Sequence, residues 1–197
     1  MAKDADLGAV VEIQHSDPAP ELIGLAGDVE RARRLGRALT ISDGILDPKR
    51  PVVVLESAAK PIAFLQYSVG PSASGALSAP LVVRTVAALG SGVVGLPRRL
   101  AARRAIRLAA PAGSLYIAEL HVHPEHRGRG FGGQLLAWSS QHCRVLGLGQ
   151  RSLITGSENP AIRLYERAGF EIVERATDAR YQQVFGEAGR VLMVACP

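Results

Sequence analysis

The chain has 197 residues, of which 47% are hydrophobic and 21% are charged, and its formal net charge is +5. This length suits one domain with a substantial buried core, and the composition excludes a globally disordered chain. The sequence lacks a secretory leader and any apolar run of the roughly 20 residues that a membrane span needs, so we expect a cytoplasmic protein with no membrane span.

The positive charge is concentrated in the middle of the chain, where no acidic residue occurs between Glu56 and Glu119. A basic segment can attract nucleic acid, anionic lipid or an acidic substrate. No helix-turn-helix, zinc-finger or RNA-stacking pattern accompanies it, so we expect no nucleic-acid partner. The basic residues of this stretch are Lys60, Arg84, Arg98, Arg99, Arg103, Arg104 and Arg107.

Cys143 and Cys196 do not form a metal-type cluster, so we expect no metal. Cys143 lies on the apolar side of a predicted helix, which favours a reduced, buried thiol and a cytoplasmic location. The strong use of arginine over lysine, with abundant alanine and glycine, indicates a GC-rich bacterial genome.

In the first part of the chain, residues 9–14 alternate weakly between apolar and polar and predict a strand. Apolar residues then recur at helical spacing across residues 19–39, after Asp17 as a capping residue. We expect this region to form two short helices, broken near Gly24 or Gly27.

Residues 51–55 and 62–69 predict two strands joined as a hairpin, and residues 70–80 predict a loop. Residues 81–109 show an amphipathic helical pattern. Glycines and a proline within residues 90–97 should divide this pattern into two helices.

The second half alternates strands and helices. Strands are predicted at residues 115–122, 151–155, 170–174 and 191–195, helices at 134–146 and 159–168 with Gly169 as a stop, and a polar loop between the last two strands. This order predicts an α/β domain with a mixed, largely antiparallel sheet flanked by helices.

A glycine-rich turn, residues 123–133, joins the first of these strands to its helix. Its exposed N–H groups and the helix dipole would favour an anion, and glycine lets the backbone approach a phosphate closely. Arg127 and Arg129 add positive charge. The alternative is an ordinary basic surface turn.

Two stretches resemble one family. Arg127-x-x-Gly130-x-Gly132 matches the acyl-CoA pyrophosphate motif of the GNAT (GCN5-related N-acetyltransferase) superfamily. The second stretch, residues 158–170, is similar to that family's other signature, with an Asn near a helix start followed by A-x-x-L-Y-E-x-x-G-F. The resemblance covers residues 115 to about 174 and is faint before them.

The resemblance implies a single GNAT-like domain over residues 1–197, with a helical insertion at about 77–112 before the central strand. It also implies an N-acetyltransferase that uses acetyl-CoA as co-substrate and acetylates a small-molecule or peptide amine. The insertion is interpreted as a lid or as an element that packs in a homodimer. The alternatives are a clamp for an acidic acceptor and an interfacial membrane helix.

By the same resemblance, the backbone of Leu120, His121 and Val122 holds the pantetheine and the acetyl carbonyl. Tyr165 matches the family's general acid, with a half-buried structural aromatic as the alternative. Asn159 either contacts the cofactor or caps a helix. The cradle for the diphosphate comprises Arg127, Gly128, Arg129, Gly130, Phe131, Gly132 and Gly133.

Strand alternation predicts Ile117, Glu119 and His121 on one face. Glu119 or His121 could take the proton of the amine, although a solvent-facing or structurally paired Glu119 is nearly as good an interpretation. His123 and His126 are interpreted as turn residues.

Neither cysteine lies in a motif, which favours direct attack of the amine on the thioester over a covalent enzyme intermediate. The rival hypothesis is a non-catalytic acyl-CoA-binding or sensing module whose basic insertion binds a partner. A mononucleotide-binding domain is a poor third, because there is no Walker lysine.

Overall fold

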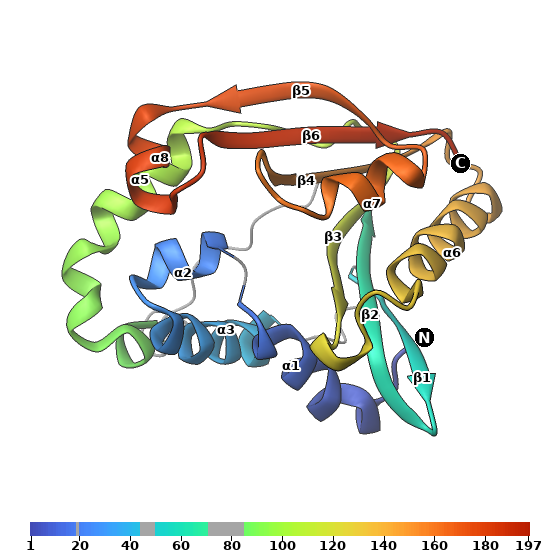
Figure 1. Ribbon diagram of the computed structural model, residues 1–197, viewed down its shortest axis with the longest axis horizontal. Coiled ribbons are helices and arrows are strands. Elements are labelled where there is room, and N and C mark those ends of the chain that lie inside the picture. The colour runs from blue at the N-terminus through green and yellow to red at the C-terminus, as the bar shows by residue number, and fades with distance from the viewer. Residues whose placement is uncertain (19, 44–49, 71–84) are drawn as a thin grey trace.

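A six-stranded sheet forms the centre of the fold (Figure 1). It is seen in a computed structural model that describes residues 1–18, 20–43, 50–70 and 85–197. Its spatial order is β1-β2-β3-β4-β6-β5, and within these residues only the β3–β4 pair is parallel. This confirms the mixed, largely antiparallel sheet. The strands are β1 (Val52–Ser57), β2 (Lys60–Val69), β3 (Ser114–Val122), β4 (Gln150–Gly156), β5 (Glu171–Thr177) and β6 (Gly189–Ala195).

Helices cover both faces of this sheet. On one face, α6 (Phe131–Val145) packs Leu135 and Leu136 into a core shared with β3, and α7 (Ile162–Arg167) contributes to the same core. On the other face, α1 (Leu7–Ser16) packs Val10 and Ile13 against Phe64 of β2. None of the described helices is both long and apolar enough to cross a membrane.

The strand predicted at residues 9–14 is wrong, because this segment lies within α1. Val10 and Ile13 are three residues apart and share one buried helical face, which outweighs the weak alternation. Asp17 ends α1 as its C-cap. The predicted pair of helices follows as α2 (Pro20–Ala26) and α3 (Val29–Asp43), and the break falls at Gly27, whose φ is +98°.

The β1–β2 hairpin is confirmed, with Ala58 and Ala59 in the left-handed region at its turn. Most of the loop predicted at 70–80 and the start of the predicted insertion lie outside the described residues. Residues 85–89 are helical and are followed by the 3₁₀ helix η2 (Gly90–Gly95) and by α5 (Leu96–Ala105). The predicted division at the glycines is therefore confirmed.

The polar loop predicted before β6 is wrong in part, because it contains α8 (Ala179–Phe185). The Asp178 side chain caps this helix by accepting from the N–H groups of Arg180 at 2.8 Å and Tyr181 at 3.1 Å, and Gly186 ends it with φ +77°. Tyr181 is buried against α5. Both capping signals were present in the sequence.

Candidate active site

The sheet opens between its two parallel strands. β3 and β4 are paired only from Ser114 with Gln150 to Ile117 with Leu153. β3 nevertheless continues to Val122, and β4 continues to Gly156. The two strands therefore diverge beyond the pair of Ile117 and Leu153.

The backbone of β3 points hydrogen-bonding groups into this opening. The N–H of His123 donates to the carbonyl of Ile62 at 2.8 Å, on the β2 side. Because backbone groups alternate between the two sides of a strand, the N–H groups of Leu120 and Val122 point to the β4 side. The Val122 carbonyl accepts from Arg127 Nε at 3.2 Å.

The glycine-rich turn opens α6 as predicted. Gly128 and Gly130 have φ +74° and +84°, and Gly130 provides no side-chain cap. The N–H groups of residues 131–133 have no acceptor within the helix, because the first such bond runs from Gln134 to Gly130. Uncapped N–H groups at a helix N-terminus favour an anion.

Gly132 allows α6 to lie close to α7. A Cβ at this position would lie 2.9 Å from Leu164 Cδ2 and 3.7 Å from Leu120 Cδ2. A larger side chain would therefore separate the turn from β3 and α7. A second cavity, of about 460 Å³, lies along this contact and is lined by Gly130, Gly133 and Arg167 among others.

Arg127 and Arg129 lie on the turn, and both are exposed. Arg127 Nη1 binds Asp17 Oδ2 at 2.7 Å, with half of the arginine side chain exposed. This ion pair ties the turn to the end of α1. The sequence contained no signal for it, because the two residues are far apart in the chain.

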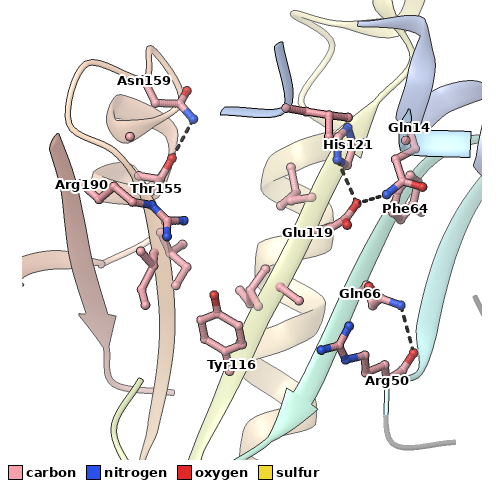
Figure 2. A pocket seen from close by; sticks show the side chains of 18 of the residues that line it. Gln14, Arg50, Phe64, Gln66, Tyr116, Glu119, His121, Thr155, Asn159 and Arg190 are labelled. Carbon is pink, nitrogen blue, oxygen red and sulfur yellow. Dashed lines mark hydrogen bonds and ion pairs between the residues drawn. The ribbon is translucent and has the colours of Figure 1, made fainter. Parts of the chain in front are cut away.

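A cavity of about 610 Å³ lies on the α1 side of the sheet and reaches the opening (Figure 2). Its lining includes the backbone of the opening at Leu120, together with all three predicted catalytic side chains, Glu119, His121 and Tyr165. The structure therefore brings together the residues that the sequence placed in two separate motifs. No group of three or more His, Cys, Asp or Glu side chains in the described ranges could hold a metal.

A β-bulge decides which side chains face this cavity. Gln66 is opposite Glu119 and Tyr67 is opposite Ile117, so Ala118 is an extra residue in β3. The predicted placement of Ile117 on the face of Glu119 and His121 is wrong, because Ile117 packs in the core under α6. The bulge changes the alternation and brings Tyr116 onto the cavity side instead (Figure 2).

The carboxylate of Glu119 is held by two neighbours (Figure 2). Gln14 Nε2 donates to Glu119 Oε2 at 2.7 Å, and His121 Nε2 lies 3.2 Å from the same oxygen. The His121 ring stacks on Phe64, with 5.0 Å between the ring centroids. No sequence pattern points to Gln14, which lies 105 residues before Glu119.

His15 lies behind this group, on α1, and is 3% exposed. Burial lowers the pKa of its imidazole to about 4, against an opposing effect of Glu119. His15 is therefore neutral at pH 7. No pattern in the sequence distinguishes it from a surface histidine.

Tyr165 lies at the opposite wall and is 8% exposed. Its ring meets Phe170 edge to face at 6.2 Å, and burial raises the pKa of its phenol to about 12. Asn159 Nδ2 donates to Thr155 Oγ1 at 2.7 Å, and its Oδ1 accepts from the Ala161 N–H at 2.8 Å. Asn159 thus stabilises the turn before α7, but the N-cap of this helix is Ala161 and not Asn159.

Comparison with known proteins agrees with this geometry. Residues 85–172 match the acetyltransferase (GNAT) domain family. The chain is 32% identical over 105 residues to the streptothricin acetyltransferase of Streptomyces lavendulae, covering 53% of this chain and 55% of that protein. It is 39% identical over 74 residues to the mycothiol acetyltransferase of Saccharomonospora viridis, covering 37% of this chain and 23% of that protein. The chain thus spans about half or less of the length of these relatives.

Solved structures share the fold across the whole chain. The ribosomal-protein-S18-alanine N-acetyltransferase of Escherichia coli superposes with a TM-score of 0.60 at 15% identity, over 99% of this chain and 90% of that one. An acetyltransferase of Bacillus subtilis in complex with CoA superposes with a TM-score of 0.52 at 13% identity, over 80% and 82% of the two chains. Residues 85–172 are thus similar to the acetyltransferase (GNAT) domain family, and the solved structures show a shared fold.

Proposed function

We propose that this protein transfers the acetyl group of acetyl-CoA to a primary amine by direct attack of the amine on the thioester. One observation carries the proposal. β3 diverges from β4 beyond Ile117, and it leads from a cavity that contains a fixed carboxylate to a helix whose first N–H groups have no acceptor within the helix. The names of the relatives in the preceding section support the same class of reaction.

In this proposal, the N–H groups of residues 131–133 hold the diphosphate. The N–H groups of Leu120 and Val122, which face the opening, bind the pantetheine and the thioester carbonyl. Bound acetyl-CoA supplies an activated acyl group with a thiolate leaving group. Arg127, already paired with Asp17, positions the turn and keeps the Val122 carbonyl occupied.

Glu119 is proposed to accept the proton of the attacking amine, with Gln14 and His121 fixing its orientation. The C–N bond forms as the C–S bond breaks, and the Leu120 and Val122 N–H groups stabilise the charge that develops on the carbonyl oxygen. Tyr165 then protonates the departing sulfur. Its raised pKa keeps the phenol protonated throughout the neutral range.

His121 is the alternative base. We favour Glu119 because the imidazole is stacked on Phe64 and turned toward the carboxylate. The Glu119→Gln and His121→Gln variants separate the two roles. Glu119→Gln should lower kcat by about 100-fold, and His121→Gln should lower it less, since it leaves the carboxylate in place.

The test of the function combines two measurements on the whole chain. Calorimetry measures CoA binding, and a thiol-release assay with acetyl-CoA measures transfer to a broad panel of amines. Binding together with release supports the enzyme. Binding without release from any amine would favour the non-catalytic CoA module, and absence of binding would remove both.

A further inference from the structure

We propose that the acceptor of this site is an amino acid, a primary amine that also carries a carboxylate, with the carboxylate held beside Arg50 and the amine beside Glu119. This assignment rests on the proposed function and specifies its second substrate. It comes from the polar groups that share one wall of the 610 Å³ cavity.

The two ends of this wall are fixed relative to each other by the sheet. Gln66 and Glu119 are directly opposite each other on β2 and β3, which puts their Cβ atoms about 5 Å apart on the same face. Gln66 Nε2 donates to the Arg50 carbonyl at 3.3 Å, so Arg50 lies next to Gln66. Figure 2 shows the Arg50 side chain extending along the cavity toward Tyr116.

These groups have the chemistry of a carboxylate site. A guanidinium donates two parallel bonds to a carboxylate, and an amide N–H and a phenol O–H are further donors. At the other end, Glu119 is an acceptor for an amine. At about 3.3 Å per residue along a strand, Tyr116 lies roughly 7–10 Å from Glu119, which fits an amino acid or a dipeptide.

The other charged residues that line the cavity bear on whether the far end of the acceptor is a carboxylate or a second cation. Among the residues that the structure describes, Arg103 of α5 and Arg190 of β6 line it with Arg50, and the acidic residues of the lining are Glu119 and Glu187. A polyamine would place its second cation against guanidinium groups, while a carboxylate would be attracted to them. Arg98 and Arg104, exposed on α5, extend this positive potential outside the cavity.

The test is a direct binding measurement on the whole chain saturated with CoA. Calorimetry compares each of the common α-amino acids with its own carboxamide, which keeps the amine and removes the negative charge. At least one amino acid should bind about 10-fold or more tightly than its carboxamide. Arg50→Gln should abolish that difference, and Arg50→Lys should retain part of it.

Arg98→Gln is the control, because it removes an exposed arginine charge on α5 that does not line the cavity. It should keep the wild-type preference. Equal binding of acids and carboxamides, tighter binding of polyamines, or no binding of any amino acid would overturn the assignment. CoA binding and thiol release with other amines report separately on the proposed function, so the two failures are distinguishable.

Discussion

The two sides of the opening between β3 and β4 are built in different ways. The proposed cofactor side comes from one continuous segment, residues 120–133, and uses backbone N–H groups together with glycines that make room. The proposed acceptor side comes from side chains on α1, on β2, on β3 and at residue 50. A site made of backbone is encoded locally, whereas a site made of side chains depends on the whole fold.

The largest effect should come from the backbone side. In the Gly130→Val variant, a β-branched residue must adopt φ +84°, which displaces the turn and the N–H groups behind it. CoA binding should weaken about 1,000-fold, since several charge-assisted bonds are lost together. Calorimetry with CoA measures this change.

Gly147→Val is the matched control, because Gly147 has φ +66° at the other end of α6. Both variants should lower thermal stability similarly, and only Gly130→Val should affect CoA. Equal loss of CoA affinity in the two would show that strain in α6, and not the turn itself, is responsible.

The next effect concerns Tyr165, which lies where the two sides meet. Tyr165→Phe keeps the buried ring and its contact with Phe170 but removes the proton donor. The value of kcat should fall by about 100-fold while CoA affinity stays unchanged. Steady-state thiol release and calorimetry give the two quantities.

Tyr67→Phe controls for the loss of a phenol elsewhere, since the Tyr67 hydroxyl bonds His142 Nε2 at 2.8 Å on the α6 face of the sheet. Turnover should remain at the wild-type level in this variant. A Tyr165→Phe enzyme that is equally active would leave Tyr165 with a packing role.

Arg151 tests what holds the backbone side in place. Its buried guanidinium donates to the carbonyls of Leu136, Ala168 and Cys196 at 2.9–3.2 Å, which joins α6, the end of α7 and the end of the chain. Arg151→Met should lower the free energy of unfolding by about 3 kcal/mol, because buried carbonyls lose charged donors. Denaturant unfolding measures this change in the free energy of unfolding.

The exposed Arg144 donates to the carbonyl of Pro197 at 2.8 Å and provides the control. Arg144→Met should cost under about 0.5 kcal/mol, as is usual for surface positions. A similar small cost for Arg151→Met would mean that α6 and α7 are held by apolar packing alone.

This difference also explains which parts of the molecule the sequence could predict. The strand, glycine turn and helix around Gly130 follow from local spacing and turn chemistry, and they were predicted correctly. The bulge at Ala118 was not, because it appears only when β2 and β3 are paired, and it places Tyr116 in the cavity. The bond from Gln14 to Glu119 needs α1 to pack on the sheet, and residues 9–14 were predicted as a strand.

The smallest expected effect is a difference in pH dependence between the acceptor side and the cofactor side. His15 has a pKa of about 4 in the folded protein because it is buried, against an ordinary value of 6.5 in the unfolded chain. Below pH 6.5 the unfolded chain therefore binds a proton that the folded chain does not, and stability falls as the pH drops from 6.5 toward 4. Because the imidazole borders the cavity, where water screens it, we expect a loss on the order of 1–2 kcal/mol.

Denaturant unfolding between pH 7 and pH 5 measures this loss, with His15→Gln as the variant that removes it. His142→Gln, on the opposite face of the sheet, leaves His15 in place and should keep the wild-type slope. Since His15 packs within α1, which reaches the turn at Gly130 only through the exposed pair of Asp17 with Arg127, acid should weaken binding of the acceptor at a higher pH than binding of CoA. If the affinities for the acceptor and for CoA fell together as the pH dropped, the acceptor side and the cofactor side would be one cooperative unit. Their different construction would then have no consequence for stability.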